Sequence, residues 1–154
     1  MLEDHISSKK SLFSTGVHTE LREQNSRSRR VSLIQGNPTG NQRTEQSGIC
    51  ARVYQNGVYG FSSIAECSGQ AAETVLKAAT ENALFMDRHV GRGKEALPVI
   101  PATSVPTGKE ILDADQKRYI DFAKELDAYI VKKYPGLSSR SVIASEDSME
   151  KIIC

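Results

Sequence analysis

Histidine is the residue type that metal chemistry needs first, because a zinc peptidase holds its metal with two histidines one helical turn apart beside a carboxylate. The chain has three histidines, His5, His18 and His89, and none of them is followed by glutamate. They fall in a poorly patterned start, a predicted strand and the end of a predicted helix. We interpret them as unrelated surface histidines, and we expect no metal site and no cofactor in this chain.

Nucleophilic catalysis has equally little support in the sequence. The chain has no Gly-x-Ser-x-Gly segment, and none of its three cysteines lies near a histidine in sequence. Cys50, Cys67 and Cys154 are an odd number without Cys-x-x-Cys spacing, which argues against a disulfide framework or a zinc ribbon. Residues 91–94 are similar to a phosphate loop but lack the Ser or Thr after the lysine, so we interpret them as a helix end. We therefore expect no catalytic residue.

Two groups of charged side chains allow a functional and a structural interpretation. Arginines surround the first two predicted strands, where they could form an anion or nucleic-acid patch: Arg22, Arg27, Arg29, Arg30 and Arg43. Nearby glutamates balance them. Binding of single strands requires aromatic residues among the basic ones, and none lies between positions 21 and 43. Carboxylates alternate with lysines on the second predicted helix: Asp113, Asp115, Asp121, Glu125 and Asp127. We interpret both groups as solvated surface.

Composition limits the class of protein. A chain of 154 residues with 38% hydrophobic and 25% charged residues is long enough to bury a core as one compact domain. A formal net charge of +1 argues against a dedicated nucleic-acid or membrane-surface binder. No apolar run approaches the roughly 20 residues that span a bilayer. The polar start lacks the apolar centre of a signal peptide, so we expect a cytoplasmic protein.

Alternating apolar residues predict strands, which would have to position any functional groups. The predicted strands are residues 17–24, 29–35, 47–55, 58–62, 139–145 and 149–154. A cluster of Gly, Pro and Asn predicts a surface loop at residues 36–41. Residues 1–16 are expected to be frayed or weakly helical, and residues 17–154 to form a single domain.

Two helices and a proline-rich connection complete the predicted order. Ser68 is the expected N-cap of a helix ending near Asp87. Three of the five prolines lie in residues 97–108, which predicts an extended tether. A second helix is predicted to begin with a capping box at Asp113 and Gln116. Its expected buried face is Leu112, Tyr119, Phe122, Leu126 and Tyr129. Together these elements predict an α+β fold, a mostly antiparallel sheet of about six strands with two helices packed on one face.

The dipeptide Asn56-Gly57 joins two predicted strands and is the strongest short-range signal for a hairpin. An edge strand exposes N–H and C=O groups to which an extended peptide can pair, and strand glycines let another backbone approach. Such glycines can equally mark bulges. If a peptide is bound, we expect main-chain groups to hold it, at Ser47, Gly48, Ile49, Ala51, Val53, Val58, Gly60 and Ser62.

The residues around this hairpin carry a family resemblance. Glu20-Leu21-Arg22 opens the first strand, and Glu45-Gln46-Ser47-Gly48 leads into Ala51-Arg52-Val53 and then into residues 56–63. This pattern resembles the N-terminal domain of the TldD/PmbA family, also called modulator of DNA gyrase proteins. The resemblance covers residues 17–87 well, and the rest agrees in order and length. The leading amphipathic helix of the family is barely recognisable in residues 1–16.

The resemblance implies a function that this chain would not perform alone. Family members are zinc metallopeptidases whose HExxxH helix lies in a later part of a much longer chain, and two subunits enclose a channel for unfolded peptide. This chain has no HExxxH. The resemblance thus implies a non-catalytic domain that helps to form the channel and the homo- or hetero-oligomer, with zinc only in the missing C-terminal part.

Two alternatives remain open at this point. One is a stand-alone peptide-binding or protein-interaction module, and the other is a nucleic-acid or gyrase-associated regulator. The reading frame beyond Cys154 separates the first from the peptidase domain, because only the peptidase continues into an HExxxH motif.

Overall fold

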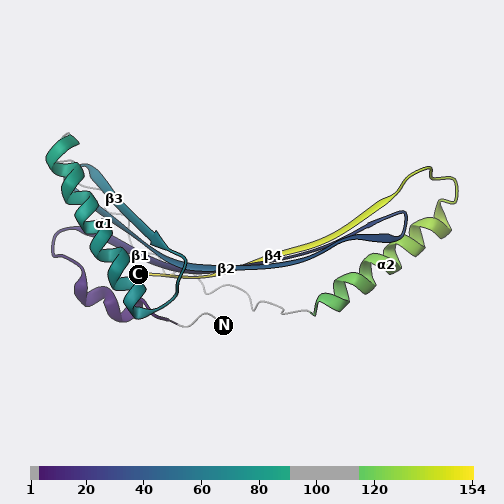
Figure 1. Cartoon of the computed structure of the whole chain (residues 1–154), viewed down its shortest axis with the longest axis horizontal. Coiled ribbons are helices and arrows are strands. Elements are labelled where there is room, and N and C mark those ends of the chain that lie inside the picture. The colour runs from purple at the N-terminus through teal and green to yellow at the C-terminus, as the bar shows by residue number, and fades with distance from the viewer. Residues whose placement is uncertain (1–3, 91–114) are drawn as a thin grey trace. The chain divides into compact units, whose positions relative to one another are not determined.

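The computed structural model describes residues 4–90 and 115–154 (Figure 1). Its elements are η1 (Ser7–Leu12), β1 (His18–Ile34), β2 (Asn37–Gln55), β3 (Val58–Ile64), α1 (Gly69–Val90), α2 (Gln116–Lys133) and β4 (Ser141–Ile153). The strands form one sheet in the order β3-β2-β1-β4. The predicted α+β fold is confirmed, with four antiparallel strands instead of six. The predicted tether at residues 97–108 lies outside the described residues.

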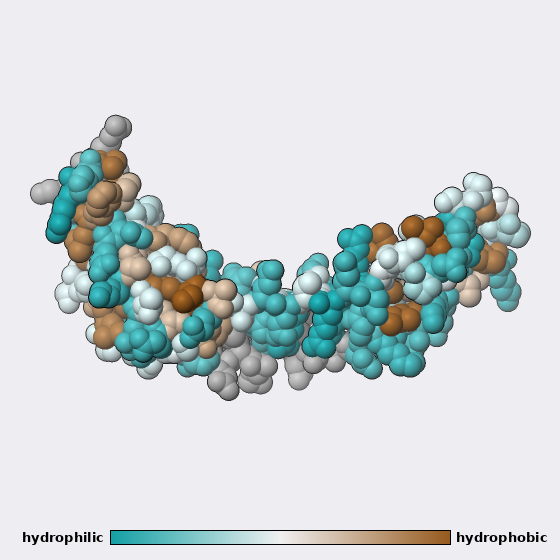
Figure 2. All heavy atoms as spheres, viewed as in Figure 1, coloured by the Kyte–Doolittle hydropathy of each residue, from teal (hydrophilic) through white to brown (hydrophobic). Residues whose placement is uncertain are grey.

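The strand count differs because two pairs of predicted strands are continuous. Leu21 and Cys154 exchange two main-chain hydrogen bonds of 3.0 and 2.9 Å, and Gln35 N donates to Arg140 O at 3.1 Å near the other end of β1. Both contacts belong to a single antiparallel register, in which β4 pairs with β1 from Leu21 to Ile34. The polar residues that interrupt the apolar alternation lie within these strands, and the surface over the middle of the sheet is mostly hydrophilic (Figure 2). The main-chain ladder continues where the apolar pattern stops.

Two tight turns have the same geometry, and only one was predicted. Asn56 and Gly57 have φ values of 49° and 85°, which confirms the predicted hairpin between β2 and β3. Gln35 and Gly36 have φ values of 52° and 79° and join β1 to β2 in the same way. The predicted loop at residues 36–41 is therefore wrong. Pro38 follows Asn37, the residue that flanks this turn. The main-chain nitrogen of Pro38 therefore points away from β1, so its missing N–H costs no ladder hydrogen bond.

Backbone contacts divide the chain into two compact units, each with its own core. Of the described residues, unit 1 contains 4–25, 46–90 and 150–154, and unit 2 contains 26–45 and 115–149. In both units the odd-numbered residues of β1 belong to the core that a helix covers, Leu21 in unit 1 and Val31 and Leu33 in unit 2. Each helix therefore packs on one face of the sheet, as the alternation of β1 requires.

The core of unit 1 is formed by α1 and the hairpin strands. The Ser68 hydroxyl accepts a hydrogen bond from Ala71 N at 3.0 Å, which confirms Ser68 as the N-cap of this helix. The small face of α1 is buried with alternate residues of β1 and β2: Leu21, Ile49, Ala51, Val53, Ala72, Val75, Ala79 and Ala83. Small side chains allow the helix backbone to approach the sheet closely.

The core of unit 2 corrects the face predicted for the second helix. Ala123 is buried with Val31, Leu33, Val142 and Ala144. The predicted buried residues Phe122, Leu126 and Tyr129 are instead 57%, 36% and 55% exposed. The helix carries two apolar stripes about one residue apart, and the one centred on Ala123 packs because its small side chain allows closer contact. The N-cap is Asp115, whose carboxylate accepts from Lys117 N, and not a box at Asp113, which lies outside the described residues.

Gly60→Ala tests how closely α1 approaches β3. A Cβ atom at position 60 would lie 1.9 Å from the Ala79 carbonyl oxygen and 2.3 Å from Ala83 N, both of them helix backbone. Because backbone cannot rotate away, we expect a loss of about 2–3 kcal/mol in the free energy of unfolding, measured by urea denaturation. Gly136→Ala is the matched control, since nothing lies within 4 Å of its added Cβ. Equal midpoints for the two variants would contradict the close approach.

Candidate functional site

The sheet order restricts which predicted peptide-binding residues can offer main-chain groups. β2 lies between β3 and β1, so the main chain of Ile49, Ala51 and Val53 is inside the sheet. β3 is an edge strand, and it carries the predicted residues Val58, Gly60 and Ser62. Peptide binding by these residues stays a prediction. Of the predicted residues in the paired part of the hairpin, only those of β3 have an edge that an added strand could reach, and Ser47 and Gly48 precede the part of β2 with which β3 pairs.

The hairpin register identifies the outward main-chain groups of β3. In a two-residue hairpin the flanking residues, here Gln55 and Val58, exchange both of their hydrogen bonds, and hydrogen-bonded pairs then alternate along the ladder. Val58, Gly60 and Ser62 consequently direct their N–H and C=O groups toward β2. The outward groups belong to Tyr59, Phe61 and Ser63. One of them already has a partner, because Asn82 Nδ2 donates to the Phe61 carbonyl oxygen at 2.9 Å.

The two strand glycines serve the chain's own packing. Gly60 admits the backbone of α1, as its contacts with Ala79 and Ala83 show. A Cβ at Gly48 would lie 2.5 Å from the Ile64 carbonyl oxygen and 3.3 Å from Ala65 Cα, at the end of β3. Both positions let another backbone approach, as predicted, but that backbone belongs to the same chain.

The other edge of the sheet is β4, and it is longer. The register with β1 places the even-numbered residues of β4 in hydrogen-bonded pairs, as Cys154 and Leu21 show. The odd-numbered residues therefore direct their N–H and C=O groups away from β1, and in unit 2 they are Ser141, Ile143, Ser145, Asp147 and Met149. All of these side chains are exposed. The alternation of side chains does not reveal this edge, because it shows the faces of a strand and not its neighbours.

A buried ion pair in unit 2 corrects the interpretation of Asp127 as solvated surface. Its side chain is buried, and Arg140 donates to its two oxygens at 2.7 and 3.2 Å. Arg140 also donates to Gln35 Oε1 at 2.9 Å, beside the turn that contains Gly36. The fork of Arg140 thus joins the end of α2, the first turn and the start of β4. This network positions three elements and is satisfied internally, which leaves it no capacity for a ligand.

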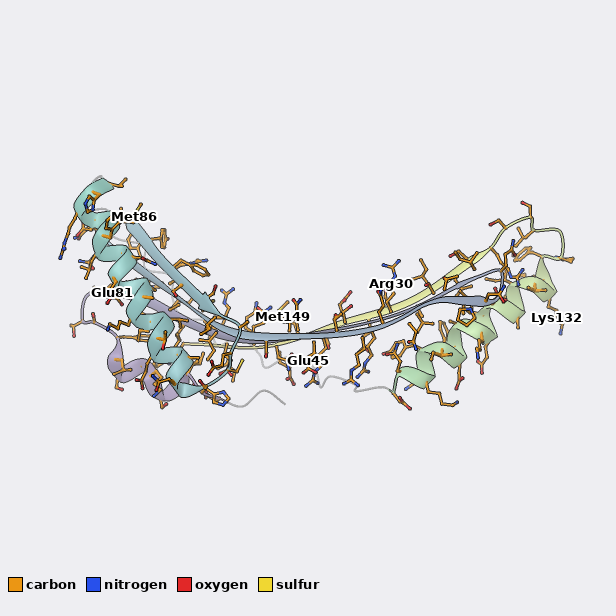
Figure 3. The ribbon with its side chains drawn as sticks, in the orientation of Figure 1. Arg30, Glu45, Glu81, Met86, Lys132 and Met149 are labelled. Carbon is orange, nitrogen blue, oxygen red and sulfur yellow. The ribbon has the colours of Figure 1, made fainter. Side chains whose placement is uncertain are left out.

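The arginine group is mostly paired, and one member is buried. Arg29 is 6% exposed and lies 3.6 Å from Glu146, the residue directly opposite it on β4. Tyr119 of α2 donates its hydroxyl to the same carboxylate, and this hydrogen bond raises the pKa of the tyrosine. Arg27 pairs with Glu45 at 3.0 Å. Arg30 and Glu45 project to opposite sides of the sheet (Figure 3). The five arginines therefore do not form a single patch.

His5 also differs from the surface residue that was expected. Its Nδ1 atom lies 2.7 Å from Glu23 Oε1, and its main-chain N–H donates to Glu23 Oε2 at 3.1 Å. Glu23 is fully buried, so these bonds supply the polar partners that its carboxylate needs. Among residues 4–90 and 115–154, no three His, Cys, Asp or Glu side chains are grouped to hold a metal ion. The pair fixes the start of the chain to β1.

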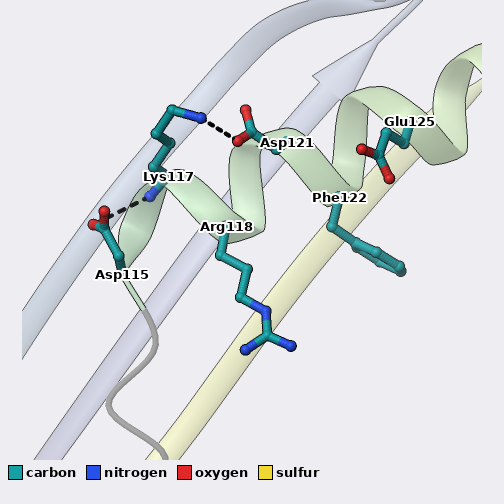
Figure 4. Close-up of a pocket in the computed structure, with 6 residues that line it drawn as sticks. All are labelled: Asp115, Lys117, Arg118, Asp121, Phe122 and Glu125. Carbon is teal, nitrogen blue, oxygen red and sulfur yellow. Dashed lines mark hydrogen bonds and ion pairs between the residues drawn. The ribbon is translucent and has the colours of Figure 1, made fainter.

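A shallow hollow follows the exposed side of α2. It is lined by Asp115, Lys117, Arg118, Asp121, Phe122 and Glu125 (Figure 4). All of these residues come from one helix and its N-cap, Lys117 binds Asp121, and Asp115 caps the helix. A hollow of this kind exposes charge but brings no groups together from different elements, so it supports no catalytic assignment.

Together these features define an α+β sheet domain with open edges at β3, β4 and the first part of β2, and with internally satisfied polar networks. Residues 19–83 match the family profile of the PmbA/TldA metallopeptidase domain 1. This range includes the Asn56-Gly57 hairpin and most of the Ser68-capped helix, on which the expected resemblance depends. The resemblance to the N-terminal domain of the TldD/PmbA family is confirmed.

Solved structures show the same fold over most of this chain. A proposed modulator of a DNA gyrase from Thermotoga maritima MSB8 has a TM-score of 0.68 at 16% identity, covering 97% of this chain and 33% of that one. TldE from Thermococcus kodakarensis gives 0.64 at 11% identity, covering 88% and 31%. A proposed modulator of DNA gyrase from Bacteroides thetaiotaomicron VPI-5482 gives 0.55 at 16% identity, covering 90% and 32%.

The chain therefore spans about a third of the length of these relatives. No curated protein matches the sequence. Neither α1 nor α2, the two α-helices of the described residues, is long and apolar enough to cross a membrane.

Asp127→Ala tests the buried network of unit 2. The substitution leaves the Arg140 guanidinium without its carboxylate partner, so we expect the free energy of unfolding to fall by about 3 kcal/mol, as for other buried pairs broken on one side. Asp121→Ala removes an exposed carboxylate of the same helix and should cost less than about 0.5 kcal/mol. Urea denaturation of both variants measures the difference. Similar losses would show that burial does not distinguish the two pairs.

Proposed function

We propose that this chain is the N-terminal, non-catalytic domain of a TldD/PmbA-like zinc metallopeptidase of the cytoplasm. The match of residues 19–83 to the PmbA/TldA metallopeptidase domain 1 is the observation that carries this proposal. The domain would form part of the channel for an unfolded peptide and contribute to assembly with a second copy or a relative. Hydrolysis and zinc would belong to another part of the larger protein, because the sequence has no HExxxH.

The open edge of β4 is the place where this domain would hold a peptide. Five odd-numbered residues of unit 2, Ser141 to Met149, direct main-chain groups away from β1 in one unbroken row. An extended peptide can add to such a row by main-chain hydrogen bonds, with little dependence on its side chains. That mode suits an unfolded substrate of varied sequence.

The edge of β3 is a weaker site for the same purpose. β3 has only seven residues, and the Asn82 side chain occupies the Phe61 carbonyl oxygen. An added strand would have to displace this hydrogen bond before it could pair with the centre of β3. β4 has thirteen residues and charged side chains such as Glu146 and Asp147 that limit uncontrolled pairing between copies.

The proposal predicts binding without cleavage. An unfolded, reduced and alkylated protein labelled with fluorescein should show a saturable rise in anisotropy when the chain is added, because main-chain pairing needs no particular side chain. Gel electrophoresis after long incubation with and without added zinc should show intact substrate. Zinc-dependent fragments would contradict the non-catalytic assignment, and a flat titration would contradict the role in holding peptide.

Ser145→Pro tests the β4 edge directly. Proline removes the outward N–H of residue 145 and leaves the ladder with β1 intact, so we expect affinity for the unfolded protein to fall about 2- to 10-fold, the equivalent of one hydrogen bond. Ser145→Ala is the matched control, because it changes the side chain and keeps the N–H. Thermal unfolding of both variants verifies that each is folded. Equal affinities for folded proline and alanine variants would exclude this edge.

A further inference from the structure

The sheet face of unit 1 opposite α1 carries aromatic rings beside basic side chains. Tyr54 and Tyr59 are directly opposite each other on β2 and β3, with ring centroids 4.7 Å apart. Arg52 is opposite Phe61, and its guanidinium carbon lies 5.9 Å from the centroid of Tyr59. Tyr59 and Phe61 are 49% and 53% exposed. The register therefore places a row of flat rings on the face that does not contribute to the α1 core.

Charges gather on the same face around Cys50. Burial is the main cause that raises the pKa of the Cys50 thiol, and the charges of Arg22, Arg52 and Lys151 oppose it while Glu20 adds to it. All four charged groups are thus close enough to act on one thiol. Glu20 is bound to Arg22 at 2.7 Å, which leaves an excess of positive charge on this part of the sheet.

We propose that this aromatic face, formed by Arg22, Arg52, Tyr54, Tyr59, Phe61 and Lys151, binds single-stranded nucleic acid. Bases would stack on the rings of Tyr59 and Phe61, while the basic side chains pair with the phosphates. The antiparallel sheets of some RNA-binding modules expose aromatic rings that stack on unpaired bases in this way, since every base has a π-face. The activity goes beyond the proposed peptide role and uses a different surface.

Two observations favour a nucleic acid over a peptide as the occupant. The rings are accompanied by an excess of positive charge, which a phosphate backbone complements and an average unfolded peptide does not. The central strands of this face, β1 and residues 49–55 of β2, have a neighbouring strand on each side, so a ligand that lies across the face meets side chains and not free main-chain groups. Flat rings and guanidinium groups recognise bases and phosphates without a fixed sequence.

The first experiment measures binding of a fluorescein-labelled oligothymidylate of about 12 nucleotides to the whole chain, within the site sizes of known single-strand binders. Anisotropy should rise for the single strand and much less for the same sequence as a duplex, whose bases are already stacked. Phe61→Ala and Tyr59→Leu should each weaken binding about 5- to 100-fold, and the leucine retains apolar volume if Tyr59→Ala does not fold. Phe85→Ala removes a 58% exposed ring from α1 and should leave the affinity unchanged.

The second experiment measures the contribution of charge. The logarithm of the association constant should fall with the logarithm of salt concentration at a slope of about −2 for three phosphate contacts, and Arg52→Gln should make it less steep by about 0.7. Lys77→Gln on α1 is the matched control. Equal affinity for duplex and single strand would overturn the proposal. A Tyr59→Leu variant that no longer binds unfolded protein but still binds the oligonucleotide would also overturn the proposal, since the face would then be a peptide site.

Discussion

The main-chain ladder of β1 is the constraint on which the rest of this structure depends. One antiparallel register with β4 connects the pair Leu21 and Cys154 to the pair Gln35 and Arg140. It places Arg29 directly opposite Glu146, where a buried guanidinium finds its carboxylate. A slip of one residue would turn every core side chain of β1 to solvent and leave that charge buried without a partner. The register is therefore fixed by apolar packing and by electrostatics together.

The same ladder decides which main-chain groups are available for binding. β1 has a neighbour on each side and β3 covers only residues 49–55 of β2, so strand addition is possible at β3, at β4 and along residues 37–48 of β2. Within these strands it is possible only at alternate residues, because the others face inward. Asn82 then takes one of the outward groups of β3. The availability of an edge follows from topology and register, and the identity of its side chains matters little.

The local elements of the fold could be predicted from the sequence, and the long-range ones could not. Asn56-Gly57 and Ser68 carry their geometry within a few residues, which is why both assignments are confirmed. Gln35-Gly36 forms an equivalent turn, but the neighbouring Pro38 and Gly40 made the segment resemble a loop. Polar pairs across strands keep β1 and β4 continuous, and no window of a single strand contains both members of such a pair.

The candidate sites were harder to predict for the same reason. The periodicity of α2 allowed two buried faces, and only the contact of Ala123 with Val31 and Val142 decides between them. Asp127 looked solvated because its partner Arg140 lies thirteen residues away on another element. The glycines Gly48 and Gly60 correctly indicated a close backbone, but the sequence does not say whose backbone it is. We therefore propose β4 as the peptide edge in place of these glycines, because both of them pack against their own chain.

The two kinds of recognition that we propose, by main-chain groups and by side chains, use different surfaces of this sheet. An edge of unpaired N–H and C=O groups accepts any extended chain, so it gives affinity with little selectivity. The face of unit 1 presents rings and guanidinium groups of side chains, so it selects by the chemistry of the ligand. A sheet covered by a helix on one face retains both kinds of surface, because the helix buries alternate side chains and leaves the remainder, with the edges, in solvent.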